Sequence, residues 1–369
     1  MDRFIGSKLR KSREAIGLSQ GAFARAIGLS SEYISLLEAD KRTPSFSTLQ
    51  KLGTFLNRDI AFFFTEAAAA RDTFTLLFRA EAVDDRAREE LQRFRRYCDD
   101  YLRLETITGR RLDLAPIYPA NITPERLADE ERRRLGLGDE PIRDIFSLLE
   151  TNGCRILRMP MPAESKVSGV FIYLEQKGAA FALVNSAQSP GRQAFSAAHE
   201  YCHYLKDRLD GPVIEGPDVF IDEVVSLYHP REPFAPGFAA RFLMPPAKVR
   251  EMIEKEFRSL RVQFDQVLYL KRYFGTSTLA MLRTLRALGY ISKAQLDEYP
   301  QTDPGPREKE IFGNRADDGD GPGGWVGRLR KRTQPSDRFK LLQHEAARKI
   351  TREQPVPRPT QPTLPEPEV

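Results

Sequence analysis

Two histidines and a glutamate occur at a spacing that suits metal-dependent hydrolysis. His199, Glu200 and His203 form an H-E-x-x-H pattern, and residues four positions apart lie on one face of a helix. Both imidazoles can then bind one Zn²⁺, while Glu200 takes the proton of the water that attacks the substrate. Only four histidines occur in the chain, and two of them stand in this apolar segment, where imidazoles without a partner would be costly to bury. These residues predict a zinc peptidase site.

A catalytic zinc site usually needs a third protein ligand. The side chains of suitable type that follow the motif are Asp218, Asp222, Glu223, His229 and Glu232. Their spacing from the motif does not choose among them.

The elements around the motif predict an α+β domain. Ser189 and Pro190 are typical of a helix N-cap and first helical position, so we expect the motif on a helix that begins there. Short β-rich segments separated by Pro, Gly and charged residues precede it, over residues 154–162, 168–175 and 178–185. Helical patterns follow it as far as about Tyr299.

The N-terminal segment predicts a small, basic, all-helical domain. Ser19 is a candidate N-cap and Gly28 a candidate C-cap, and either Ser30 or Ser31 can cap the next helix. Residues 1–60 contain ten Lys and Arg against six Asp and Glu, which is most of the net charge of +5. A compact basic segment of this kind is typical of proteins that bind the phosphate backbone of nucleic acids.

The region around the motif resembles the ImmA/IrrE family of metallopeptidases. The resemblance rests on FSAAHEYCH at 195–203 and EPFAPGFAARFLMP at 232–245, and it covers roughly residues 140–300. It implies a compact zincin fold and a zinc-dependent endopeptidase. By this resemblance His199 and His203 are metal ligands, Glu200 is the general base and Glu232 is the third ligand.

This sequence departs from the family pattern beside the third ligand. Pro233 and Pro236 stand where the family has residues that favour a helix. Proline at these positions delays the start of a helix past Glu232. The third ligand therefore comes from a loop, or His229 supplies it instead.

The N-terminal domain resembles the Xre (Cro/C1-type) helix-turn-helix family over residues 9–45. This resemblance implies that Gln20 opens the second helix and can bond to phosphate. It also implies a recognition helix whose side chains face the major groove, followed by basic residues at the DNA backbone. The groove residues would be Ser31, Glu32, Tyr33 and Ser35, and the backbone residues Lys41 and Arg42.

Together these observations predict a mainly α protein with an α+β peptidase domain. The expected units are a helix-turn-helix domain (1–66), a helical linker (67–118), a zincin-like metallopeptidase domain (119–250), a helical subdomain (251–300) and a tail (301–369). The composition of the tail predicts disorder except for a short helix near residues 336–350, docked through Phe339, Leu341 and Leu342. Three cysteines and a charged N-terminus favour a cytoplasmic protein without a membrane span.

The family resemblances imply a function in transcription control. We expect a zinc endopeptidase that binds double-stranded DNA and cleaves a transcriptional repressor, releasing genes of the DNA-damage response, another stress response or mobile elements. Xre domains often dimerise, so a homodimer is an open expectation. The alternative is a DNA-binding regulator whose zincin-like region is a structural or sensing module without protease activity. The altered segment around Pro233 favours that alternative, and the intact H-E-x-x-H motif opposes it.

Overall fold

A computed structural model of the chain provides the structure. It describes residues 5–15, 18–56, 60, 63, 85–119, 121–165, 167–215, 234–257, 261–299, 304–313 and 334–353. Within this part, no helix is both long enough and apolar enough to span a membrane.

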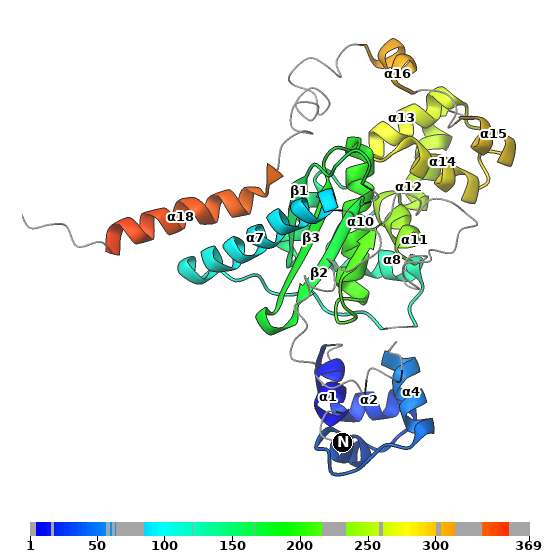
Figure 1. The fold of residues 1–369 in the computed structure, drawn as a ribbon. Helices are drawn as coiled ribbons and strands as arrows, with labels where there is room; N and C mark the ends of the chain where they lie inside the picture. Colours follow the sequence, from blue (N-terminus) through cyan, green and yellow to red (C-terminus); the bar gives the residue numbers. More distant parts are fainter. Residues whose placement is uncertain are drawn as a thin grey trace, which may run out of the picture.

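The N-terminal unit is a cluster of short helices around a small apolar core (Figure 1). Its helices are α1 (Ile5–Ala15), α2 (Gln20–Ile27), α3 (Ser31–Glu38) and α4 (Phe46–Leu56). The Ser19 side chain caps α2, and Gly28 ends it at a φ of 69°, a left-handed conformation that favours glycine. Ser30 caps α3 by accepting a hydrogen bond from the Tyr33 amide. The predicted caps of α2 are confirmed, and the choice between Ser30 and Ser31 falls on Ser30.

A five-stranded mixed sheet forms the centre of the region that carries the H-E-x-x-H motif. Its strands are β1 (Cys154–Met159), β2 (Gly169–Leu174), β3 (Ala179–Asn185), β4 (Val213–Glu215) and β5 (Gln334–Pro335). The spatial order is β4-β2-β3-β1-β5. The β1 and β3 strands run parallel and the other pairs are antiparallel. The three predicted strands are confirmed. The β4 and β5 strands, of three and two residues, are too short to stand out as β-rich segments in the sequence.

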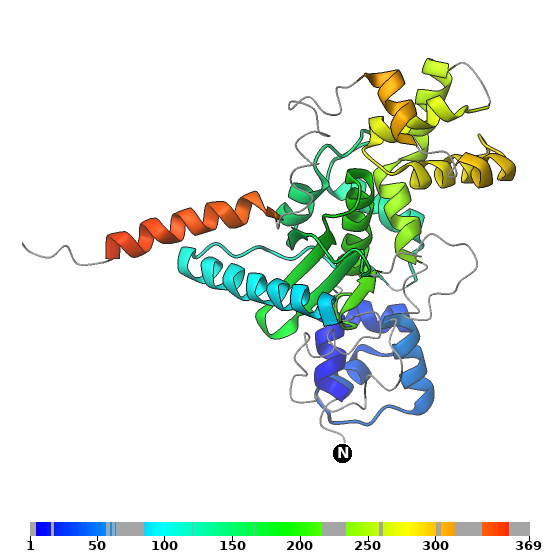
Figure 2. The same cartoon turned by 45° about the horizontal axis from the view of Figure 1, so that its top comes forward.

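Helices cover both faces of this sheet (Figures 1 and 2). One face packs against α9 (Ile145–Thr151) and α10 (Pro190–Lys206), while α11 (Phe234–Leu243) packs on α10 and α8 (Pro124–Arg134) packs on α11. The other face packs against α7 (Asp85–Thr108) and α18 (Asp337–Glu353). Alternate residues of β3 serve the two layers, since Ala182 faces the first and Phe181 the second. A 3₁₀ turn, η1 (Glu175–Lys177), joins β2 to β3.

Two expected segments have tertiary roles that their composition did not indicate. Within residues 67–118, expected to be a helical linker, α7 buries Leu91, Phe94 and Tyr101 against the sheet. Within the tail expected to be mostly disordered, residues 304–312 form α16 (Pro304–Phe312). Ion pairs from Arg307 to Asp265 and from Lys271 to Glu308 attach α16 to α13. These long-range contacts are not visible in the local sequence.

The remaining helices continue the chain after α11, as predicted. They are α12 (Pro246–Met252), the π-helical turn η2 (Ile253–Phe257), α13 (Phe264–Phe274), α14 (Thr278–Ala287) and α15 (Lys293–Glu298).

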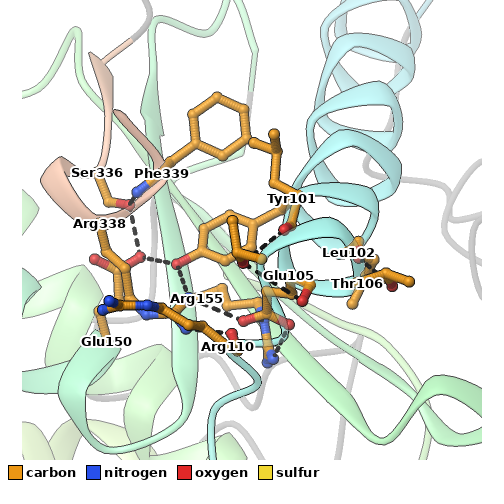
Figure 3. A network of polar contacts seen from close by, with 12 residues as sticks. Tyr101, Leu102, Glu105, Thr106, Arg110, Glu150, Arg155, Ser336, Arg338 and Phe339 are labelled. Atoms are coloured by element: carbon orange, nitrogen blue, oxygen red, sulfur yellow. Dashed lines mark hydrogen bonds and ion pairs between the residues drawn. The ribbon is translucent and has the colours of Figure 1, made fainter. Parts of the chain in front are cut away.

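The C-terminal helix docks through a buried polar network (Figure 3). Arg338 donates to Glu105 of α7, and Glu105 also accepts from Arg155 of β1. Ser336 and Tyr101 both donate to Glu150, at 2.6 Å each. Among the apolar residues of α18, Phe339 and Leu342 are buried, but Leu341 is 50% exposed. The predicted contact through Leu341 is therefore wrong, because residue 341 lies outside the face that carries 339 and 342.

Candidate functional site

The α10 helix carries the H-E-x-x-H motif in the middle of the molecule. The Ser189 hydroxyl accepts a hydrogen bond from the Arg192 amide, and Pro190 occupies the first turn. The helix is buried from Phe195 to Leu205 between the sheet and α11, so its position is determined by apolar packing on two sides. Cys202 is packed in this core.

The two motif histidines face one another. His199 Nε2 and His203 Nε2 lie 3.1 Å apart, and both residues are fully buried. At Zn–N distances of ~2.0–2.1 Å, tetrahedral geometry places two ligand nitrogens about 3.3 Å apart. The imidazole pair therefore fits two ligand positions of one zinc ion.

Asp207 holds His203 from the opposite side of the ring. Its Oδ2 lies 3.0 Å from His203 Nδ1, and both side chains are buried. When Nδ1–H donates to this carboxylate, the lone pair of Nε2 is left facing His199. Metal-binding histidines are commonly oriented by a carboxylate in this way. Asp207 is not among the predicted site residues, although an acid one helical turn after the second histidine was a usable signal in the sequence.

Glu200 lies between the histidines in sequence and contacts the start of β2. It is fully buried, and its carboxylate lies against Gly169, the first residue of β2. A Cβ built on Gly169 would lie 2.3 Å from Glu200 Oε1 and 2.9 Å from Glu215 Oε2. Any side chain at 169 would collide with both carboxylates, so this close approach requires glycine.

Glu215 forms a buried ion pair with Arg192 beside Glu200. Arg192 Nη2 lies 2.9 Å from Glu215 Oε1, with side-chain exposures of 14% and 0%. Burial lowers the pKa of Arg192, and the negative charge of Glu215 opposes that shift. Neither residue is among the predicted site residues, because the pairing of β4 with β2 is what brings Glu215 to the motif helix.

The residues considered for the third metal ligand lie outside the described residues. This holds for Asp218, Asp222, Glu223, His229 and Glu232. Among the residues that the structure does describe, no three His, Cys, Asp or Glu side chains are grouped to hold a metal ion. The α11 helix begins at Phe234, so Pro236 falls in its first turn, where a missing amide hydrogen costs little.

The helix-turn-helix unit exposes most of the residues that were predicted to contact DNA. Ser31, Glu32 and Ser35 are exposed on α3. Tyr33 is half-buried beneath the Arg42 guanidinium, 5.0 Å from its ring centroid. Lys41 and Arg42 are exposed after the helix.

Gln20 has an internal partner. Its amide donates to Glu38 Oε2 at 2.8 Å, and Arg13 binds the same buried carboxylate. Its predicted contact with phosphate stays a prediction.

Comparison with protein families identifies both units. Residues 149–286 match the IrrE N-terminal-like domain of the M78 peptidases, and residues 9–63 match a helix-turn-helix model. The chain therefore carries a helix-turn-helix domain followed by an IrrE-like peptidase domain, which confirms both predicted resemblances and the fold class. A comparison with curated proteins gave no match.

Proposed function

We propose that the chain is a zinc-dependent endopeptidase that its helix-turn-helix domain brings to a DNA-bound transcriptional repressor. The observation that carries the peptidase assignment is the buried pair of facing imidazole nitrogens on α10, 3.1 Å apart. Glu200 stands beside them on the same helix. The match to the IrrE N-terminal-like domain supports the same class of chemistry.

In this proposal His199, His203 and Glu232 hold the zinc ion. Zinc supplies a Lewis acid that polarises the scissile carbonyl and makes water acidic enough to react near neutral pH. Glu200 takes a proton from the attacking water and passes it to the leaving amine, as a general base and then a general acid. Asp207 keeps the His203 ring in the tautomer and orientation that binding requires.

The proposed substrate follows from the domain order. A protease on the same chain as a DNA-binding domain reaches proteins bound at neighbouring DNA sites at a raised effective concentration. A repressor is such a protein, and its cleavage would release stress-response or mobile-element genes.

Cleavage of cellular proteins tests the proposed activity directly. The zinc-loaded protein is incubated with a lysate of the cells that produce it, and new protein N-termini are mapped by mass spectrometry. We expect one or a few cleavage sites, in a DNA-binding protein, that are absent with Glu200→Gln. The amide cannot take the proton of water, but it leaves the fold and the zinc site in place.

Metal analysis of a ligand variant completes the test. His203→Ala should lose the zinc, since two remaining ligands rarely hold a catalytic ion. Undiminished zinc in this variant would refute the site. Bound zinc in the wild type without any cleavage that depends on Glu200 would instead favour a regulator whose zincin-like region is a sensing or structural module.

A further inference from the structure

A buried arginine, Arg192, pairs with Glu215 close to Glu200, the candidate general base. Arg192 precedes Glu200 by eight residues on α10, and its guanidinium binds Glu215 Oε1. The other oxygen of Glu215 and Oε1 of Glu200 flank the same point above Gly169. Three charged side chains, one positive (Arg192) and two negative (Glu215 and Glu200), are thus packed close together at the start of β2.

Glu215 is held in place by more than its ion pair. Its carbonyl accepts a hydrogen bond from the Ser168 amide at 2.9 Å, within the pairing of β4 with β2. The Ser168 hydroxyl accepts from Gln188 at 2.8 Å and from Arg192 at 3.4 Å. Backbone and side-chain bonds therefore connect β4, β2 and α10 at this point.

The second oxygen of Glu215 adds an independent observation. Within the described residues, Oε2 is buried and accepts no hydrogen bond. A carboxylate that served only to satisfy Arg192 would be expected to engage both oxygens with the guanidinium. Here one oxygen binds the cation, and the other lies, with Glu200 Oε1, beside the position that a Cβ on Gly169 would take.

We propose that Glu215 is a positioning residue for Glu200. By forming an ion pair with Arg192, Glu215 keeps this buried cation from pairing with the general base. The inference rests on the proposed peptidase function. A guanidinium in a site with little water needs a carboxylate partner. Without the charge of Glu215, the carboxylate across Gly169 is that of Glu200, and an ion pair there would withdraw it from the attacking water.

Three variants separate this electrostatic role from a packing role. They are Glu215→Gln, Arg192→Met and the double variant, with Asp129→Asn as a matched control. Asp129 pairs with Arg241 in the same domain, at 43% exposure. Activity is measured on a fluorogenic peptide that spans the cleavage site found in the lysate, together with zinc content.

We expect Glu215→Gln to lower kcat roughly 100-fold, the scale of a displaced catalytic group, with zinc content and KM nearly unchanged. The double variant should recover most of this loss, because the Arg192 guanidinium is then absent and cannot pair with Glu200. Asp129→Asn should behave as the wild type. Equal loss in Glu215→Gln and the double variant, or no loss in Glu215→Gln, would overturn the proposal.

A crystal structure of Glu215→Gln tests the same idea without any substrate. We expect the Arg192 guanidinium within ion-pair distance of Glu200, about 4 Å or less. An Arg192 that stays in its original place, or turns to solvent, would overturn the proposal. If the wild type cleaves no protein, the proposed peptidase function is wrong. The position of Arg192 in the crystal structure of Glu215→Gln still tests whether Glu215 keeps Arg192 away from Glu200. If Glu215→Gln does not fold, the double variant should fold, because it removes the buried cation together with the charge of Glu215, and its failure to fold would also count against the proposal.

Discussion

Asp207 should control zinc affinity without being a ligand. Its carboxylate lies 3.0 Å from His203 Nδ1, and the side chains of both residues are at most 1% exposed. Removal of such a partner typically weakens metal binding by roughly 10- to 100-fold. Because the contact is buried, water cannot readily replace the lost carboxylate. We therefore expect Asp207→Ala to fall near the upper end of that range, about 2.7 kcal/mol of binding free energy.

Asp207→Asn separates the two effects of the carboxylate. The amide oxygen still accepts a hydrogen bond from Nδ1–H, but the negative charge is lost, so the loss of affinity should lie near the lower, tenfold end. Asp129→Asn is the control for a change of net charge elsewhere in the domain.

The assay is competition for zinc with a chromophoric chelator at fixed pH, with circular dichroism to compare the folds. Wild-type affinity in a folded Asp207→Ala variant would refute the claim that Asp207 orients His203. Equal losses for Ala and Asn would show that charge, rather than the hydrogen bond, is what matters.

Three further predictions concern the other parts of the chain. In residues 1–66, Lys41→Ala should weaken binding to all duplex DNA alike and reduce its salt dependence, whereas Glu32→Ala should mainly reduce sequence preference. Anisotropy titrations measure both effects, and the absence of binding at low salt would refute DNA recognition. Phe339→Ala should destabilise the docked α18 by about 3 kcal/mol. Leu341 is 50% exposed, so Leu341→Ala should cost under about 0.5 kcal/mol. Hydrogen exchange in α18 measures the difference, and equal effects would mean that the helix is not docked. Burial opposes ionisation of Glu38, but hydrogen bonds from arginine and glutamine partners hold its pKa below the ordinary value of 4.5. The stability that this carboxylate contributes is therefore present above about pH 4.5 and lost as the pH falls through the lowered pKa. Thermal unfolding between pH 6 and 3 should show a smaller acid-induced loss in Glu38→Gln, and an identical loss would contradict this.

The sequence predicted the structural features that depend only on residues close together along the chain. The caps at Ser19 and Ser189, the strands and the motif helix all follow from local patterns. These are a capping side chain, a short β-rich segment bounded by Pro, Gly or charged residues, and a spacing of four residues. The H-E-x-x-H residues belong to this class, because one helical turn is enough to bring the imidazoles together.

The rest of the candidate site depends on contacts between distant segments. Glu215 reaches Arg192 only because β4, three residues long, pairs with β2. Nothing in the local pattern of β4 indicates a strand. The sequence also gives no sign that Gly169 is important, because its role is to leave space for the carboxylates of Glu200 and Glu215.

The start of α11 shows how a local rule and a tertiary contact combine near the motif. Pro233 and Pro236 predicted that the helix begins after Glu232, and α11 begins at Phe234. What the prolines could not indicate is where this helix packs. Phe238 and Phe242 stack on one another and lie against Tyr201 of the motif helix. The place of α11 against the motif helix is therefore set by an aromatic contact between distant segments, which no local rule at the prolines could indicate.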